Sequence, residues 1–241
     1  MITMRQFRFF IIAAAALCLA CSSNAAGKWT APRTVYYLTE QQQQFPGFKA
    51  PPAMNSKEEL ADLAVVRDWN RKRTEGQCAE ARAQAQAEYE EFFGDLSPFP
   101  SPLPAGAAVV FRRVKAESDW IDLKLKDRFN RPRPFLREPG LKHCLESIDG
   151  PSYPSGHAVI SRVYALILSD LVPQRRAEFL ARADEAALYR VISGVHYPSD
   201  IEAGKKLADA IYAKLLKSRV FGADMSALKG YLSGSPALAA K

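Results

Sequence analysis

Apolar residues recur at helical spacing along most of this 241-residue chain, and strand patterns are nearly absent. The clearest example is the run Ala203, Leu207, Ile211 and Leu215, where an apolar residue occupies every fourth position. Such spacing places the apolar side chains on one face of an α-helix. The short run 109–111 is rich in valine but lies within a helical pattern. The sequence therefore predicts an all-α fold, a compact single-domain helical bundle.

The helical pattern begins at Ser56. Ser56 followed by Glu59 is typical of a capping box at a helix start. An apolar stripe follows, formed by Leu60, Leu63, Val66 and Trp69. Further helices are expected over residues 78–93, 107–130, 155–171, 173–192 and 199–217. The helix over 107–130 should stop at Arg131-Pro132, because the residue before a proline disfavours the α conformation.

The first 26 residues have the layout of a secretory signal. Arg5 and Arg8 precede an apolar stretch over 9–20, and small residues follow it up to Ala26. The apolar stretch is shorter than the roughly 20 residues that span a bilayer. We expect cleavage near Ala26 and a periplasmic or secreted protein. A lipoprotein anchored through Cys21 is the alternative.

Three further segments follow from composition. Residues 27–55 combine a glutamine tract with Pro46, Pro51 and Pro52, which predicts an irregular, proline-rich N-terminal arm. Residues 56–218 form the helical domain, interrupted by an extended connection in which prolines alternate from 98 to 104. The tail over 219–241 is expected to hold one short helix. About 215 residues remain after the signal, enough for one core.

Charge and hydropathy exclude some classes of protein. Without Arg5 and Arg8 the chain keeps 31 basic and 26 acidic residues, which is compatible with an anionic ligand. The longest later apolar run, 158–172, contains Arg162 and Asp170, so no membrane span is expected in the mature chain. The oligomeric state stays open, and a homo-oligomer is one option.

Two cysteines remain after the signal, Cys78 and Cys144. In an oxidising exported compartment they could form a disulfide, and only one pairing exists. Two buried free thiols are the alternative.

The basic run over 124–137 is by default a solvated face, and its rival is a nucleic-acid patch. Prolines break the run, and Phe129 and Phe135 are its only aromatic residues. We therefore expect no nucleic acid as a partner.

Metal binding is not indicated either. The three histidines, His143, His157 and His196, form no His-x-x-x-His pair, and no Cys-x-x-Cys pair occurs after the expected signal, which contains Cys18 and Cys21. We assign no metal ligands and no cofactor, and no catalytic role to His143.

Ser155-Gly156-His157 stands directly before an apolar helical run. A helix start carries unpaired N–H groups and a partial positive charge, and both favour phosphate. Glycine lets an anion oxygen approach the backbone closely. The simpler alternative is a plain helix cap with an incidental histidine.

His196 and Asp200 flank a second expected helix start, where Ser199 and Glu202 have the spacing of a capping box. A first-turn acidic residue is favoured by the helix dipole alone. In the functional interpretation, the Asp200 carboxylate accepts a hydrogen bond from one imidazole nitrogen of His196 and leaves the other nitrogen free to attack. Arg190 lies on the preceding helix, which should end near Gly194.

Three motifs in order resemble the signature of the type 2 phosphatidic acid phosphatase superfamily. They are Lys126-x6-Arg133-Pro134, Pro154-Ser155-Gly156-His157 and Arg190-x5-His196-x3-Asp200. Within it, the expected export, the arm and Ser152-Tyr153 are similar to bacterial class A non-specific acid phosphatases. The chain departs from the pattern at Tyr189, where serine is usual, and at Pro151, where glycine is usual.

The resemblance implies a helical phosphatase domain that hydrolyses small phosphate monoesters without a cofactor. His196 would attack phosphorus to form a phosphohistidine, His157 would give and take the proton, and Asp200 would orient His196. The phosphate would be held by Lys126, Arg133, Ser155, Gly156 and Arg190.

Three alternatives stay open. The superfamily also includes vanadium-dependent haloperoxidases, whose pocket holds vanadate in place of phosphate. A non-catalytic anion-binding protein would use the same residues without turnover. A Ser/His/Asp hydrolase built on Ser155 lacks the expected glycine-flanked nucleophile turn on a strand.

Overall fold

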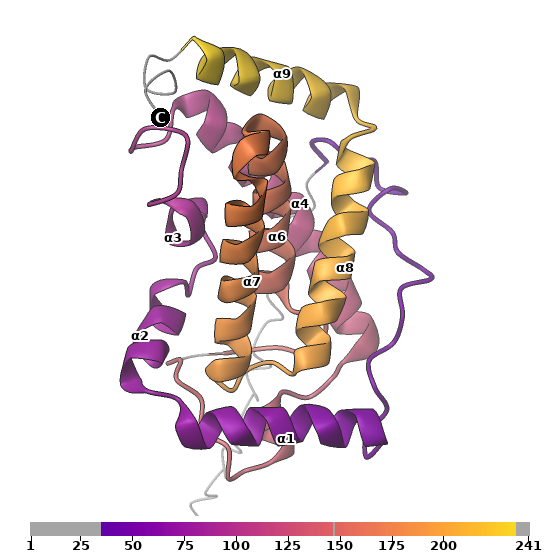
Figure 1. Ribbon diagram of the computed structural model, residues 1–241. Coiled ribbons are helices and arrows are strands. Elements are labelled where there is room, and N and C mark those ends of the chain that lie inside the picture. The colour runs from indigo at the N-terminus through magenta and orange to yellow at the C-terminus, as the bar shows by residue number, and fades with distance from the viewer. Residues whose placement is uncertain (1–34, 147, 235–241) are drawn as a thin grey trace, which may run out of the picture. The chain divides into compact units, whose positions relative to one another are not determined.

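A computed structural model describes residues 35–146 and 148–234, and the expected signal and Cys21 lie outside them. Helix α6 (Gly156–Leu171) is buried along most of its length, because nearly every side of it is apolar. It packs against α4 (Ala105–Phe129), α7 (Arg176–Ile192) and α8 (Pro198–Leu215). No strand occurs in the described residues, and the predicted all-α bundle is confirmed (Figure 1).

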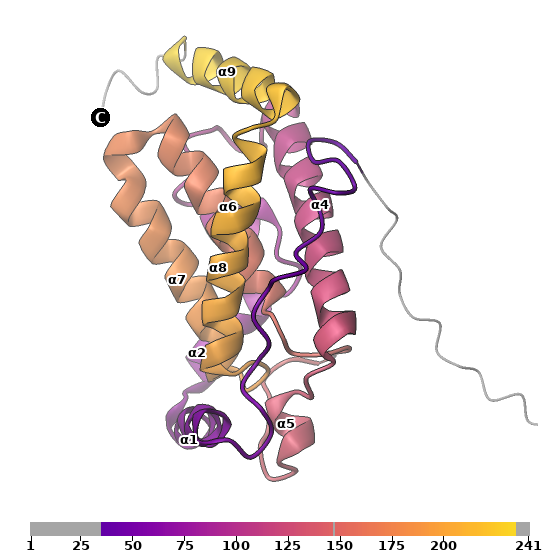
Figure 2. The same ribbon diagram turned by 90° about the vertical axis from the view of Figure 1, so that its right-hand side faces the viewer.

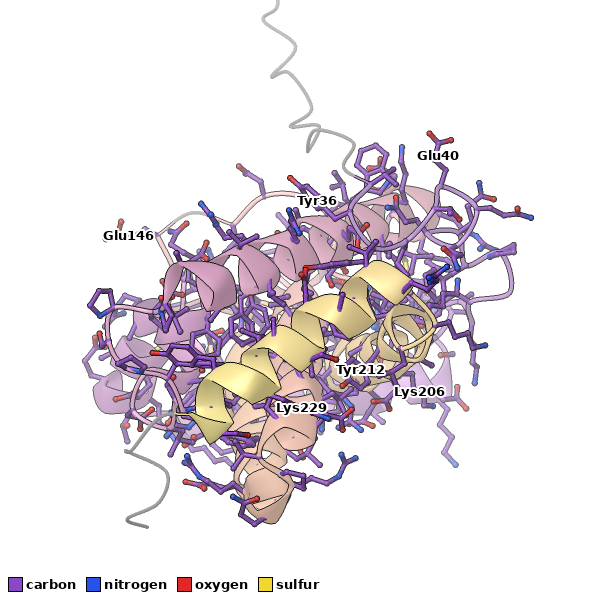
Figure 3. The ribbon with its side chains drawn as sticks, turned by 90° about the horizontal axis from the view of Figure 1, so that it is seen from above. Tyr36, Glu40, Glu146, Lys206, Tyr212 and Lys229 are labelled. Atoms are coloured by element: carbon purple, nitrogen blue, oxygen red, sulfur yellow. A yellow bond between two sulfur atoms is a disulfide. The ribbon has the colours of Figure 1, made fainter. Side chains whose placement is uncertain are left out.

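The predicted apolar stripe of α8 is buried against this core. Helix α9 (Arg219–Ser233) follows α8 and buries Phe221, Met225, Leu228 and Leu232 on the same core. Figure 2 shows α9 across the end of the bundle, and Figure 3 looks down on it, with Lys229 on α9 and Tyr212 on α8. The expected short helix of the tail is thus a packed helix of 15 residues.

Helix α1 (Lys57–Lys72) lies at the opposite end of the bundle (Figure 1). Ser56 caps it by accepting a hydrogen bond from the Glu59 N–H, as predicted. The Glu59 carboxylate accepts from the N–H of Asn55 instead of Ser56, so the reciprocal half of the box is shifted by one residue. Leu63 and Val66 are buried, whereas Leu60 is exposed and was wrongly placed on the buried stripe.

The single helix predicted over residues 78–93 is wrong. The chain forms two shorter helices, α2 (Glu75–Ala83) and α3 (Tyr89–Phe93). Between them Ala87 has a φ of 55°, a left-handed conformation that no α-helix contains. The alanine-rich sequence gave no sign of this break between the two helices. The break places the Gln84 carbonyl beside His157.

Helix α4 ends where the prolines predicted. Its C-cap, Asn130, adopts a left-handed conformation, and residues 131–133 continue as an extended link. A short helix that the sequence did not indicate, α5 (Pro134–Arg137), follows. A 3-10 turn, η1 (Pro173–Arg175), precedes α7, so the helix predicted from Pro173 begins three residues later.

The described part of the arm, residues 35–55, has no regular structure and lies along α4 (Figure 2). A buried carboxylate on α4, Glu117, holds its beginning. One oxygen, Oε1, accepts hydrogen bonds from the N–H groups of Tyr36, Tyr37 and Leu38 at 2.8, 2.9 and 3.0 Å. No helix of the described residues has the length and apolar character needed to cross a membrane.

Cys78 on α2 and Cys144 in the loop after α5 form a disulfide across 66 residues of sequence. The bond joins α2, which leads to Gln84, to a loop held at the end of α7, where the Cys144 N–H donates to the Ser193 carbonyl at 3.1 Å. Arg82 reinforces it, because its Nη1 donates to the Cys144 carbonyl at 3.1 Å.

The double variant Cys78→Ser, Cys144→Ser is expected to lower the free energy of unfolding by about 4 kcal/mol, because a loop of this length gains considerable entropy when it is opened. Urea denaturation of wild type and variant measures the difference. A reductant should destabilise the wild type by a similar amount and leave the variant unchanged. Equal stability of the two oxidised proteins would contradict the expected contribution of the disulfide.

Candidate active site

The beginning of α6 and the beginning of α8 meet at the end of the bundle next to α1 (Figure 1). Ser155 caps α6 as predicted, and its own N–H donates to the Asp200 carbonyl at 3.1 Å. Gly156 follows. A Cβ there would lie 2.8 Å from Asp122 Oδ2, so any larger residue would collide with that carboxylate. The first turn of α6 is therefore held against both α4 and α8.

The turn between α7 and α8 places His196. Gly194 has a φ of 81° and ends α7, as the sequence predicted. The chain then folds back, so that the N–H groups of Val195 and His196 both lie 3.2 Å from the Arg190 carbonyl. The backbone that carries His196 is thus fixed to the same residue whose side chain belongs to the site.

His196 lies between an anion and a cation. Its Nδ1 is 3.2 Å from Asp200 Oδ2, and its Nε2 is 3.3 Å from Arg133 Nη1. Asp200 Oδ2 also accepts from the Tyr197 N–H at 2.9 Å. Because a carboxylate accepts hydrogen bonds, this geometry places the proton of the neutral imidazole on Nδ1 and the lone pair on Nε2.

The predicted capping box at the start of α8 is wrong. Asp200, not Glu202, accepts the capping hydrogen bond, and the helix begins at Pro198. Ser199 instead contacts Asp62 of α1, which accepts from the Ser199 N–H at 3.2 Å. The proline at the first helical position needs no hydrogen-bond partner, which moves the helix start one residue earlier than predicted.

Burial and neighbouring charge shape the protonation of His196 and Asp200. Burial, assisted by the positive charge of Arg133, lowers the pKa of His196 well below its usual range. Burial raises the pKa of Asp200 to about 6, although the charge of Arg131 opposes the increase. His196 is therefore neutral at neutral pH, as a nitrogen nucleophile must be.

Three cations act on His196, the buried Arg133 and Arg190 and the partly buried Lys126. Arg133 donates from Nε to the Gly150 carbonyl at 2.9 Å, from Nη1 to the Val195 carbonyl at 3.0 Å and from Nη2 to the Asp149 carbonyl at 3.0 Å. Lys126 donates to the Pro154 carbonyl and lies 3.6 Å from Asp122 Oδ2. Lys126 is thus held beside the start of α6, and Arg133 between residues 149–150 and the turn that carries His196.

Arg190 is 2% exposed, and its Nε and Nη1 have no hydrogen-bond partner among the described residues. Burial and the charge of Arg133 lower its pKa to about 9, and burial lowers the pKa of Arg133 to about 10. Positive groups that lack compensating anions favour an anionic ligand, because the ligand's charge offsets the cost of burial. The site therefore fits a multiply charged oxyanion such as phosphate.

His157 is the first-turn histidine of α6. Its Nε2 is 2.8 Å from the Gln84 carbonyl, which can only accept, so this nitrogen carries a proton and Nδ1 is the nitrogen left to exchange one. Phe92 contacts the ring edge-on. Burial and the charge of Arg190 lower the pKa of His157 well below its usual value.

The structure brings the eight predicted site residues close together, some in direct contact and others near enough for their charges to act on one another. Their catalytic and binding roles remain predictions. The eight are Lys126, Arg133, Ser155, Gly156, His157, Arg190, His196 and Asp200. His143 is not among them and contacts Phe135, with 4.4 Å between the ring centroids and the rings tilted by 43°. The basic run is split: Lys124 and Arg128 are exposed, as a solvated face requires, whereas Arg131 and Arg133 are buried. Within the described residues, no cluster of three possible metal-ligating side chains occurs.

Three acidic or basic residues of the site were missed in the sequence. Asp122 lies four residues before Lys126 on α4, a spacing that could have revealed the pair. Arg131 was assigned to the basic run over 124–137, and the sequence analysis gave Asp62 no role. Their burial depends on packing between distant segments, which spacing along the chain does not encode.

Residues 108–215, from α4 to α8, match the family model described as the PAP2 superfamily. The match covers 108 of the 241 residues of the chain. This range includes every residue of the three motifs.

Two relatives are acid phosphatases. The acid phosphatase of Zymomonas mobilis subsp. mobilis is 35% identical over 128 residues, covering 51% of this chain and 48% of the relative. The non-specific acid phosphatase of Salmonella typhi is 33% identical over 148 residues, covering 59% and 58%. The chain thus spans about half the length of these curated relatives.

Among solved structures, a bacterial vanadium-dependent iodoperoxidase is similar with a TM-score of 0.51 and 21% identity, covering 70% of this chain and 52% of that one. This likeness concerns the fold.

Asp122 has an expected effect on anion binding. Its Oδ1 is buried without a hydrogen-bond partner among the described residues, and burial raises its pKa to about 6. Above pH 6 the ionised carboxylate repels an anion at the site, and below pH 6 it is neutral. Asp122→Asn should therefore bind inorganic phosphate about tenfold more tightly than wild type at pH 8 and about equally at pH 5.

Isothermal titration calorimetry at the two pH values measures this difference. Asp119→Asn is the matched control, because Asp119 lies on the same helix and pairs with Lys115 at 2.9 Å, outside the motif residues. Equal gains for both variants would attribute the effect to net charge alone and contradict a specific role of Asp122.

Proposed function

We propose that this protein is an acid phosphatase that hydrolyses phosphate monoesters through a phosphohistidine intermediate at His196. The observation that carries the proposal is the arrangement of that ring. Its Nδ1 faces the Asp200 carboxylate, and its Nε2 faces a guanidinium, Arg133. The acid phosphatase relatives support the reaction class.

In the first step, the lone pair of His196 Nε2 attacks phosphorus, and the bond between phosphorus and the alcohol oxygen breaks. The alcohol oxygen takes a proton from His157. Asp200 stabilises the positive charge that develops on His196. To act as the acid, His157 must carry a second proton on Nδ1, because Nε2 is held by the Gln84 carbonyl. The charge of Arg190 helps to lower the pKa of His157, and a bound phosphate dianion offsets that charge, which raises the pKa and favours the protonated ring.

In the second step, a water molecule attacks the phosphohistidine. His157, now neutral, takes a proton from this water, and the bond between His196 Nε2 and phosphorus breaks to release phosphate. The negative charge on the phosphoryl oxygens is stabilised in both steps by Lys126, Arg133 and Arg190, assisted by Ser155 and the Gly156 amide. The chain's own cations supply the electrostatic stabilisation, so the proposed reaction uses no metal.

The protein is further proposed to be exported, with residues 1–26 removed as a signal. The arrangement of Arg5, Arg8 and the apolar run over 9–20 supports this. N-terminal sequencing of the protein from a periplasmic fraction tests it: a start near Gly27 supports export by cleavage, and retention of Met1 would contradict it. The proposed substrates are small soluble phosphate monoesters. Activity on such monoesters, but not on phosphatidic acid in vesicles, would support this choice.

His196→Ala is expected to lower kcat for p-nitrophenyl phosphate by at least about a thousandfold, because it removes the nucleophile. His143→Ala, which changes the remaining non-motif histidine, should retain near-normal kcat. Circular dichroism checks that both variants stay folded. Turnover by His196→Ala close to that of wild type would refute the proposed mechanism.

His157→Asn is expected to discriminate between leaving groups. An alkyl phosphate needs a proton on its leaving oxygen, so its hydrolysis should slow by about 10²–10⁴-fold. Nitrophenolate leaves without a proton, so its release in the first turnover should slow far less. A single-turnover comparison of the two substrates measures this, and equal losses for both would rule out His157 as the proton donor.

The same assays separate the alternatives. Activity should persist in a chelator such as EDTA. Halide oxidation by hydrogen peroxide after addition of vanadate, without phosphatase activity, would favour a haloperoxidase. Tight binding of phosphate without turnover would favour an anion-binding protein.

A further inference from the structure

Arg131 is a buried cation that the proposed reaction does not use. It lies in the extended link between α4 and α5, two residues before Arg133, and it is 5% exposed. Its guanidinium lies 3.8 Å from the centre of the Tyr197 ring, and its backbone carbonyl accepts from the Ser152 N–H at 2.9 Å. The Tyr197 ring therefore packs against the guanidinium, and the backbone of Arg131 is held by Ser152.

The guanidinium joins two carboxylates from different helices. Its Nη1 donates to Asp200 Oδ1 at 2.6 Å and to Ser199 Oγ at 2.7 Å. Its Nη2 donates to Asp62 Oδ2 at 3.0 Å. Asp62 also accepts from Ser199, through its N–H at 3.2 Å and through its hydroxyl. Arg131 thus connects α1 to the first turn of α8.

The two oxygens of Asp200 are used separately. Oδ1 belongs to Arg131, while Oδ2 accepts from the Tyr197 N–H and faces His196 Nδ1 at 3.2 Å. Rotation of the carboxylate would break at least one of these contacts. A continuous chain of contacts therefore runs from Asp62 through Arg131 and Asp200 to His196.

We infer that Arg131 is a positioning residue, which acts on His196 through Asp200, and that Asp62 is its counter-charge. Arg131 keeps Asp200 ionised and aimed at Nδ1, and Asp62 sets how much of the positive charge Asp200 experiences. The inference rests on the proposed function, because it concerns how that nucleophile is held.

Other charged and titratable groups also face Asp200. Lys126 from α4 and Arg133 from the link contribute positive charge, Tyr153 precedes α6, and Glu59 of α1 and Arg137 of α5 act on the adjacent Tyr197. These groups are common to all the variants below. Differences between the variants therefore report the charges of Arg131 and Asp62.

Opposite shifts follow for the two partners. The pKa of Asp200 is raised to about 6 by burial, and Arg131 opposes that increase. Removing Arg131 makes the carboxylate harder to ionise, so the pKa of Asp200 rises. Removing the negative charge of Asp62 leaves the positive charge of Arg131 to act on Asp200 alone, so the pKa of Asp200 falls.

The test is the pH dependence of kcat/KM for p-nitrophenyl phosphate in the full-length protein. In Arg131→Met the acidic limb of the profile should move to higher pH by about one unit or more, and the plateau should fall by about tenfold or more. In Asp62→Asn the acidic limb should move to lower pH. Arg131→Lys keeps the positive charge but cannot donate to Asp200 and Asp62 in the geometry of the planar guanidinium. The acidic limb of its profile should therefore return toward that of wild type, while the plateau of kcat/KM stays low.

A purely structural role predicts something else. Loss of packing would lower the plateau and the melting temperature of all the variants without moving their acidic limbs in opposite directions. Shifts of the same sign in Arg131→Met and Asp62→Asn, or no shift in either, would overturn the inference.

Two controls keep the test interpretable. If a single variant does not fold, the double variant Arg131→Met, Asp62→Asn replaces it, because it removes both buried charges. The acidic limb of its pH profile should lie between the limbs expected for the two single variants. Wild type and His196→Ala are assayed in the same series. Failure of the proposed function would be seen as an inactive wild type, whereas failure of this inference leaves an active wild type and unshifted variants.

Discussion

Asp200 is the residue on which the geometry of the site depends. Its side chain is completely buried in the first turn of α8. One oxygen accepts from the Tyr197 N–H, which caps the helix, and faces His196, while the other accepts from Arg131. Its backbone carbonyl accepts from the Ser155 N–H at the start of α6. One residue therefore caps a helix, joins two helix starts and orients a histidine.

The surroundings of Asp200 carry an electrostatic cost that a ligand can offset. Lys126, Arg133 and Arg190 are buried close together, and burial lowers the pKa of each. Asp122 and Asp200 compensate them only in part, because two carboxylates oppose three cations. Burial raises the pKa of both carboxyl groups to about 6, so the compensation weakens further below that pH. A phosphate dianion bound beside these three cations would offset their positive charge.

Much of this arrangement could be predicted from the sequence, because it depends on local rules. The spacing of His196 and Asp200 across one helix start, the cap at Ser155 and the left-handed Gly194 all follow from contacts within a few residues. The helices α4, α6, α7 and α8 were recovered for the same reason. The three motifs lie at the ends of these helices, so packing the helices into one bundle brings the motifs together.

The rest could not be predicted, because it depends on contacts between distant segments. Arg131 and Lys124 are both basic residues of one run, yet only Arg131 meets Asp62 of α1 and becomes buried. The break between α2 and α3 falls in an alanine-rich stretch with high helix propensity, where the left-handed Ala87 is held by tertiary structure. That break supplies the Gln84 carbonyl to His157.

The most direct test of the central claim is to locate the phosphate during turnover. His157→Asn, mixed with p-nitrophenyl phosphate, should form the intermediate and hydrolyse it slowly, because the base for the second step is absent. Quenching in alkali, which preserves phosphohistidine, followed by peptide mass spectrometry should find one phosphate on His196 and one nitrophenol released per chain in the initial burst. Phosphate on Ser155, or turnover with no covalent phosphoenzyme, would contradict the mechanism.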